Sequence, residues 1–360
     1  MDQSYSLVFY TGIPHSGVTF LFSVLEKNPH ISTIMLSDAF FEYLAEKKHV
    51  EPTRQNGIAI YYQFIDYLSA NSNRSFRINQ VRMLINEFGS FLCKSEGFFD
   101  NFCLLTQDME SITIHDAVIT IFKAKTLSDG KSIDDNVSPV FFFDPHSHLG
   151  APLKHKQIIE GFERVDFLTA MRNPLYTTAS SIKKGYYTDK AVTYNLMKSS
   201  FMSFVQKYPA EWKNNSYVIL FEDEKLFPED TFRALCSTFS VPYDEKMLTA
   251  NEEGPTSRGY AIRGFDTEPV TRKLDDIFSE NDMKYLYCIF RRIMERYGYK
   301  NIYPDLNYSR DCDELFNIVY EKNYMCYEKK YFLEVLAELE KFSSELPDDY
   351  FWPDKIDMRK

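Results

Sequence analysis

The chain has 360 residues, of which 44% are hydrophobic and 26% are charged, a balance typical of a globular protein rather than a disordered one. Its formal net charge of -11 argues against a broad surface for nucleic acid or for an anionic membrane. Any anionic ligand therefore has to be bound by a local group of donors. A chain of this length buries a full core and is long enough for one large α/β domain or two smaller ones.

Cysteine spacing and the absence of a targeting pattern both bear on the compartment. The six cysteines are far apart, and no two have the C-x-x-C spacing, which favours free thiols over a disulfide framework or a zinc site. No run of 18 apolar residues indicates a membrane span, and no basic segment followed by an apolar stretch begins the chain. We therefore expect a cytoplasmic protein without a membrane span or a bound metal.

The first predicted element is a short, largely apolar strand over residues 6–10, as in a buried parallel sheet. A helix is expected over 18–27, and Asn28-Pro29 ends it. We interpret residues from about 36 to 127 as mostly helical, including the stretches 58–68 and 112–125. Because this region is rich in aromatic residues, we expect it to help form a pocket for an apolar or aromatic ligand.

Strands and helices alternate further along the chain. Three more strands are predicted at residues 140–143, 165–171 and 217–221. Residues 251–272 are interpreted as a long loop, 280–297 as an amphipathic helix, and 331–342 as a further helix. This order predicts an α/β fold with three layers (α/β/α) and a central parallel sheet. We expect one α/β domain over residues 1–300, with the helical insertion at 36–127, and a helical extension of unknown role at 301–360.

The segment GIPHSGVT at Gly12–Thr19 lies between the first strand and the first helix. Its spacing, G-x-x-x-x-G-x-T, places successive backbone N–H groups and a helix N-terminus around an anion. The lysine of a nucleoside-triphosphate P-loop would stand at Val18 and is missing, which argues against ATPase or kinase chemistry. The alternative is a simple glycine turn that connects a strand to a helix.

This loop resembles the 5′-phosphosulfate loop of the sulfotransferase family, whose pattern is G-x-P-[RK]-S-G-[ST]-T-x-L, frequently followed by Asn-Pro as here. The resemblance implies a P-loop-like α/β fold and binding of 3′-phosphoadenosine 5′-phosphosulfate (PAPS). The residues that it assigns to the 5′ end of the donor are Pro14, Ser16, Gly17, Val18, Thr19 and Phe20. The chain departs from the pattern at His15, which replaces an Arg or Lys, and at Val18, which replaces a hydroxyl residue.

A second motif, FLTAMRNP at residues 167–174, resembles the strand of the same family that ends in R-[DN]-P. In the family this Arg and a Ser eight residues later bind the 3′-phosphate of the donor, which assigns that role to Arg172 and Ser180. An Arg at the end of a strand and a Ser on the following helix can meet at one phosphate. The alternative is that Arg172 is a solvated cation at the end of a strand.

Weaker similarity continues downstream. Glu222 and Asp223 follow the fourth strand as in the family, and we interpret them as part of a structural strand–helix unit. Arg272 and Lys273 resemble the basic segment that closes over the nucleotide in the family, and a solvated charge cluster is the alternative.

Transfer of a sulfuryl group requires a base for the acceptor hydroxyl and a cation for the charge that develops on the leaving group. His146 and His148 follow the second predicted strand where related bacterial enzymes carry a K-x-P-x-H-like element, and Phe143 stands at its Lys position. His148 is our preferred base, with His146 as the alternative, and a surface loop histidine is the plain reading of each. A protonated His15 would supply the missing cation.

The sequence thus predicts a PAPS-dependent sulfotransferase that acts on a hydroxyl of a small molecule or lipid and leaves adenosine 3′,5′-bisphosphate (PAP) as product. Two other functions remain open at this point. A degenerate sulfotransferase-like binding domain fits the loss of family cations at His15 and Phe143. A kinase-like phosphotransferase fits the loop spacing but not Val18. The acceptor and the oligomeric state stay open.

Overall fold

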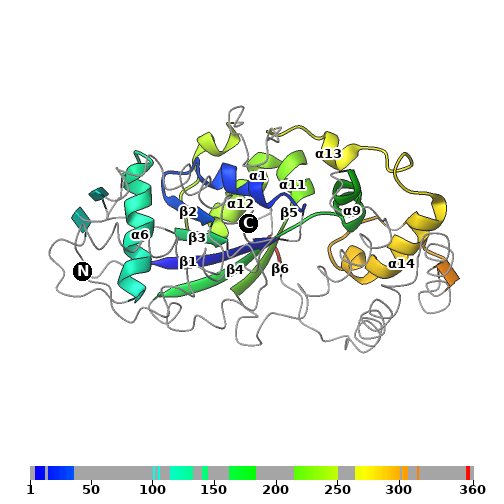
Figure 1. Cartoon of the computed structure of the whole chain (residues 1–360), viewed down its shortest axis with the longest axis horizontal. Helices are drawn as coiled ribbons and strands as arrows, with labels where there is room; N and C mark the ends of the chain where they lie inside the picture. Colours follow the sequence, from blue (N-terminus) through cyan, green and yellow to red (C-terminus); the bar gives the residue numbers. More distant parts are fainter. Residues whose placement is uncertain are drawn as a thin grey trace, which may run out of the picture.

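A six-stranded parallel sheet forms the centre of the protein, with the strand order β2-β3-β1-β4-β5-β6 (Figure 1). The strands are β1 (Ser6–Gly12), β2 (Ile31–Met35), β3 (Val140–Asp144), β4 (Arg164–Met171), β5 (Ser216–Leu220) and β6 (Asp354–Lys355). The computed structural model describes residues 5–12, 15–35, 100–101, 104–105, 114–132, 140–144, 162–183, 215–249, 264–300, 302–306, 314–315 and 354–356.

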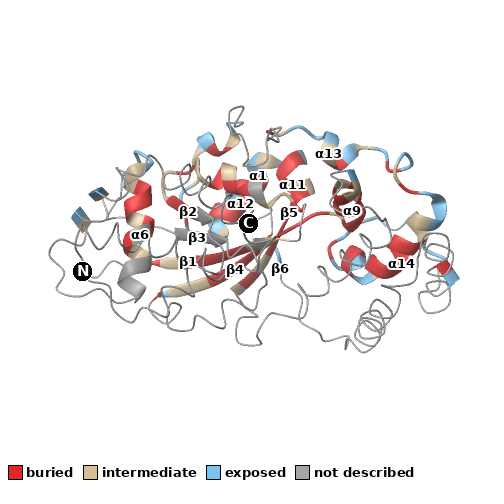
Figure 2. Ribbon diagram, in the orientation of Figure 1, coloured by how far each residue is buried: buried red, intermediate tan, exposed pale blue. Residues whose placement is uncertain are grey.

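Both faces of the central strands are covered. The last six residues of β4 are all buried although successive side chains point to opposite faces of a sheet (Figure 2). On one face the rings of Phe9 and Phe167 stack with centroids 5.4 Å apart, and on the other face Val8 and Tyr10 join the main core cluster. The predicted α/β fold with a central parallel sheet is confirmed.

The described helices are α1 (Val18–Leu25), α6 (Ile114–Ser128), α9 (Pro174–Lys183), α11 (Phe221–Leu226), α12 (Pro228–Thr238), α13 (Glu268–Thr271) and α14 (Glu280–Arg296), with a 3-10 helix at Glu245–Leu248. Helices α1 and α12 pack on the same face of the sheet through residues such as Leu21 and Phe232, and α9 contacts α14. A capping box of Ser279 and Asp282 begins α14. Among the helices that the structure describes, none is long and apolar enough to cross a membrane.

The sequence located four of the six strands and several of the described helices. The strands predicted near residues 6, 140, 165 and 217 are present, as are the helices expected at 18–27, 112–125 and 280–297. β2 and β6 were not predicted. The helices expected at 58–68 and 331–342 lie outside the described residues, and the domain boundaries remain a prediction. β6 belongs to the segment after residue 300 and pairs in parallel with β5.

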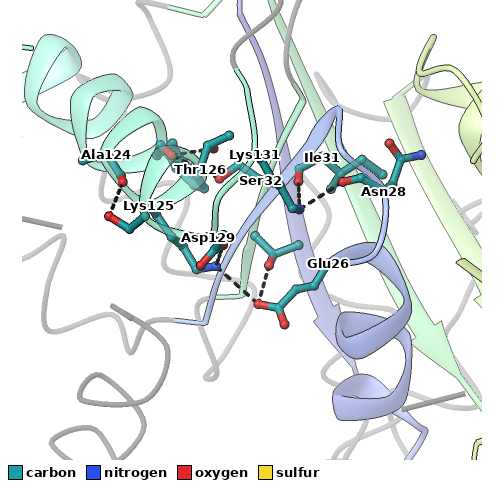
Figure 3. A network of polar contacts seen from close by, with 12 residues as sticks. Glu26, Asn28, Ile31, Ser32, Ala124, Lys125, Thr126, Asp129 and Lys131 are labelled. Atoms are coloured by element: carbon teal, nitrogen blue, oxygen red, sulfur yellow. Dashed lines mark hydrogen bonds and ion pairs between the residues drawn. The ribbon is translucent and has the colours of Figure 1, made fainter. Parts of the chain in front are cut away.

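Polar contacts connect α6 to the chain that leaves α1 (Figure 3). The buried Lys125 ammonium forms ion pairs with Asp129, at 2.5 Å, and with Glu26, at 3.4 Å. The hydroxyl of Thr33 donates to the same Glu26 oxygen over 3.0 Å. One carboxylate at the end of α1 therefore binds groups from both α6 and β2.

Lys131 extends this network just after α6. Its ammonium donates to the backbone carbonyls of Asn28 and Ile31, at 3.0 Å each, in the turn between α1 and β2 (Figure 3). Burial, helped by the charge of Lys125, lowers the pKa of Lys131 to about 8. The turn before β2 is thus held by the Lys131 ammonium, and burying the charge of this group costs free energy.

Replacing Lys131 with Met tests this linkage. In wild type the folded chain loses the Lys131 proton near pH 8, whereas the unfolded chain keeps it to near pH 10.5. The unfolded state binds more protons in that window, so this group's contribution to the free energy of unfolding rises with pH there. We expect the difference in unfolding free energy, wild type minus Lys131→Met, to grow by roughly 1–3 kcal/mol from about pH 8 to about pH 10. Urea denaturation at several pH values measures it, with Lys183→Met as the exposed control. A difference that is constant over this range would contradict the prediction.

Candidate anion-binding site

The carboxyl ends of β1, β4 and β5 meet at one edge of the sheet. Gly12, the last residue of β1, is level with Ala170 of β4, and Met171 is level with Leu220 of β5. The next residues, Arg172 and Phe221, therefore leave the sheet beside the loop that follows Gly12. Ligands of open parallel sheets bind at this edge.

The loop that follows β1 brings the N-terminus of α1 to this edge. His15 and Gly17 both have left-handed backbone conformations, with φ of 68° and 96°. Gly17 is the N-cap of α1 and has no side chain to bind the first N–H groups of the helix, and the first turn contains no acidic residue. The hydroxyl of Tyr10 donates to the Val18 carbonyl over 3.0 Å and fixes this turn against β1. Free N–H groups at a helix N-terminus favour an anion.

Ser16 lies inside the loop. Its side chain is fully buried, and its hydroxyl has no hydrogen-bond partner among the described residues. A Cβ on Gly12 would overlap the Val18 side chain and come within 2.9 Å of the Ser16 oxygen. The loop therefore folds tightly against the end of β1 only because residue 12 is a glycine, and it holds one unsatisfied donor there.

Aromatic rings pack against the backbone of this loop. A Cβ on Gly17 would overlap the ring of Phe221, so the ring and the loop backbone are in direct contact. Phe20 packs edge-on against Phe221 and Phe265, with ring centroids 5.9 and 5.4 Å away. The Lys225 ammonium lies 3.4 Å from the centre of the Phe20 ring. The Phe20 side chain is thus a core residue, and any contact of Phe20 with a ligand would come from its backbone.

Arg172 lies between this loop and α13 and forms hydrogen bonds to both. Its side chain donates to the carbonyls of His15, at 3.4 Å, and Pro269. The guanidinium lies 5.0 Å from the ring centre of Phe221 and 5.8 Å from that of Tyr176. Arg172 is only 4% exposed, and its Nε has no partner in the described part of the chain. It is therefore a buried cation rather than a solvated one.

A second guanidinium lies close enough to act on the first. Burial and, to a smaller extent, the positive charge of Arg272 lower the pKa of Arg172 to about 10, while the charge of Glu222 opposes this shift. Arg272 forms a 3.4 Å ion pair with Glu268 of α13, and its Nε is also buried without a partner among the described residues. Two like charges held together in this way favour a bound anion.

The remaining residues assigned to the nucleotide lie at different depths. Asn173 accepts the Leu175 N–H over 2.9 Å and Pro174 occupies the first turn, so the R-N-P motif both ends β4 and caps α9. Ser180 is half-buried on α9, four residues after Tyr176 and on the same face. Because Tyr176 contacts Arg172, Ser180 lies on the side of α9 that faces the site. Lys273 is exposed.

The sequence did not predict that three further residues would contact Arg172 or the residue that follows it. Tyr176 and Phe221 flank Arg172, and Glu222 accepts hydrogen bonds from the Asn173 N–H, at 2.9 Å, and from the Tyr299 hydroxyl, at 3.1 Å. Burial raises the pKa of Glu222. The position of Glu222, two residues after β5, was a usable signal, since Arg172 directly follows the neighbouring strand β4.

Several predicted site residues cannot be placed. Pro14, His146 and His148 lie outside the described residues, as does the side chain of Thr19, so their assigned roles remain predictions. Across the described ranges no group of three or more His, Cys, Asp or Glu side chains forms a candidate metal site.

Comparisons with known proteins give a distant structural likeness. No family model and no curated protein sequence matches the chain. Solved structures that resemble it include a sulfotransferase domain from the curacin biosynthetic pathway, with 12% identity, 83% of this chain and 99% of that chain covered, and a TM-score of 0.45. A sulfotransferase domain from the Synechococcus PCC 7002 olefin synthase gives 13% identity, 96% and 98% coverage and a TM-score of 0.41. Sulfotransferase STF9 from Mycobacterium avium gives 11% identity, 83% and 78% coverage and a TM-score of 0.36. At these values the function has to be inferred from the residues of the site.

Replacing Gly17 with Ala tests the packing of the loop on Phe221. The new methyl group would meet both a left-handed backbone and the aromatic ring. Gly130→Ala is a matched control, because Gly130 has a similar φ of +73° and nothing within 4 Å of an added Cβ. We expect Gly17→Ala to lower the free energy of unfolding by at least about 2 kcal/mol more than Gly130→Ala does, as measured by urea denaturation. Equal losses would show that the ring does not confine the loop.

Proposed function

We propose that this protein is a sulfotransferase that takes a sulfuryl group from PAPS and transfers it to a hydroxyl of a small molecule or lipid. The observation that carries the proposal is a group of buried donors without a described partner, two of which belong to arginines whose charges act on each other. Arg172 and Arg272 each keep a buried Nε without a described partner, and the Ser16 hydroxyl does the same. All three atoms are donors, so the unsatisfied groups at this edge of the sheet fit a ligand with several anionic groups.

Each of the two motifs fits one end of the PAPS donor. The loop residues Ser16 and Gly17, with the first turn of α1 over Val18, Thr19 and Phe20, fit the 5′-phosphosulfate. Arg172, with Ser180 on the same side and Arg272 and Lys273 beyond, fits the 3′-phosphate. Because two rings flank the Arg172 guanidinium, the N–H groups along its planar edge are the ones that can bind oxygen atoms. A hydrogen-bonded pair of a guanidinium and a phosphate contributes roughly 1.5–3 kcal/mol.

In the proposed reaction the acceptor oxygen forms a bond to sulfur while the bond from sulfur to the bridging phosphate oxygen breaks. The acceptor proton passes to a base, for which we propose His148, with His146 as the alternative. PAP leaves with the electron pair of the broken bond, and a protonated His15 next to Ser16 would stabilise its charge.

A non-catalytic binding domain is the second candidate, and one observation favours it. His15, at the family's cation position, is a half-buried residue whose carbonyl accepts a hydrogen bond from Arg172. Such a site binds the nucleotide even where the side chain at position 15 supplies no charge. A kinase-like transferase is less favoured, because Val18 occupies the position of the P-loop lysine.

Nucleotide binding separates these functions. We expect PAP, but not ATP with Mg²⁺, to raise the thermal midpoint of the wild type, because a ligand that binds the folded state adds RT ln(1 + [L]/Kd), about 2.7 kcal/mol at a hundredfold excess over Kd. Arg172→Met should weaken PAP binding at least about tenfold, since it removes a charge-assisted phosphate contact. Arg233→Met is the control, because Arg233 is an exposed arginine on α12 that pairs with Glu229. Stabilisation by ATP with Mg²⁺ alone would support the kinase, and an Arg172 variant that binds PAP as the wild type does would rule out the assigned site.

The pH dependence of transfer tests the role of His15. A histidine cation is lost as the pH rises through about 6 to 8, whereas an arginine stays charged. With a labelled donor and an acceptor panel, we expect the wild-type rate to fall relative to that of His15→Arg over about pH 5.5 to 8.5. Parallel profiles would show that His15 is not the titrating cation. Binding of PAP without transfer to any acceptor would support the non-catalytic domain.

A further inference from the structure

Glu222 connects three separate segments at the edge of the site. It stands in the first turn of α11, directly after β5. One carboxylate oxygen accepts the backbone N–H of Asn173, the residue after Arg172, and the other accepts the hydroxyl of Tyr299, just after α14. The neighbouring Asp223 turns to a different partner, the Lys355 ammonium of β6, at 2.8 Å.

The Glu222 contacts act on Arg172 in two ways. The bond to the Asn173 N–H fixes the backbone one residue beyond Arg172, while the Asn173 side chain is already engaged at the start of α9. The negative charge of Glu222 also acts on the Arg172 guanidinium. Arg172 itself donates to the backbone carbonyls of His15 and Pro269. Glu222 therefore acts on the guanidinium through the backbone and through its charge.

We propose that Glu222 is a positioning residue, whose bonds to Asn173 and Tyr299 hold the end of β4 so that Arg172 presents its free edge to a tetrahedral anion. This inference rests on the proposed function only for the identity of the anion as part of a nucleotide. It changes the interpretation of Glu222 from a structural strand–helix residue to one that sets anion affinity.

Two substitutions separate geometry from charge. Glu222→Gln keeps an oxygen that can accept the Asn173 N–H and an amide that can pair with the Tyr299 hydroxyl, but it removes the charge. Glu222→Ala removes both hydrogen bonds and the charge. Asp223→Asn is the matched control, because it neutralises the adjacent carboxylate, whose partner is Lys355. Tyr299→Phe deletes one hydrogen bond only and serves as a milder variant should Glu222→Ala fail to fold.

The probe is inorganic sulfate, which stays a dianion over the working pH range, with chloride at the same ionic strength as the control. Isothermal titration gives the Kd of each folded variant for sulfate and, separately, for PAP. We expect Glu222→Gln to bind sulfate at least as tightly as wild type, and Glu222→Ala at least about tenfold more weakly than Glu222→Gln. Tyr299→Phe should weaken sulfate binding about threefold, and Asp223→Asn should leave it unchanged. Arg172→Met should abolish it.

Equal sulfate affinity of the Ala and Gln variants would overturn the positioning role, as would an Asp223→Asn variant that loses as much affinity as Glu222→Ala. If Glu222→Ala does not fold, a Tyr299→Phe variant with wild-type affinity overturns it. Wild-type protein that binds sulfate but not PAP, with the Ala–Gln difference intact, would contradict the nucleotide donor and support the role of Glu222. Wild-type protein that binds neither anion would overturn both.

Discussion

The charge of a guanidinium that is almost fully buried has to be stabilised by the protein, and the segments around Arg172 all contribute to this. Removing a charge from water costs several kcal/mol unless other groups replace the lost solvation. Here the replacement comes from two backbone carbonyls, two aromatic rings and the charge of Glu222, supplied by segments that are far apart in the sequence. This compensation is incomplete among the described residues, because the buried Nε has no hydrogen-bond partner there.

The same compensation connects parts of the chain that the sheet alone would not hold together. Arg172 binds the carbonyl of Pro269, and Lys225, buried against the ring of Phe20, binds the carbonyl of Gly264. The segment that carries Arg272 is thus attached to the end of β4 and to α11 by two cations. Because each cation contacts a ring that also supports the loop after β1, an anion bound at the loop and the segment with Arg272 would depend on the same packing.

The sequence was sufficient where local chemistry decides the structure. An apolar run followed by a glycine loop and a helical pattern predicted β1 and α1, and R-N-P predicted a strand end followed by a helix. In the structure Asn173 caps that helix and Pro174 begins it. The strand β6 has only two residues, and its pairing with β5 depends on contacts across more than 130 positions, so no local pattern marks it. Glu222 was underestimated for a similar reason. Its function depends on Asn173 and Tyr299, which only the folded chain brings to it.

His15 shows that the geometry of the loop and the charge beside it are set by different parts of one residue. Its backbone is held in a left-handed turn, with its carbonyl against Arg172, and neither feature depends on the imidazole ring. A change of side chain at this position therefore leaves the frame of the anion site in place while it changes the charge next to the loop. The conformation of the loop itself depends on Gly12, Gly17 and the aromatic rings that pack against the loop. The backbone of the loop and the rings packed against it thus set the geometry of this edge of the sheet, while the side chain of residue 15 sets only the charge beside it.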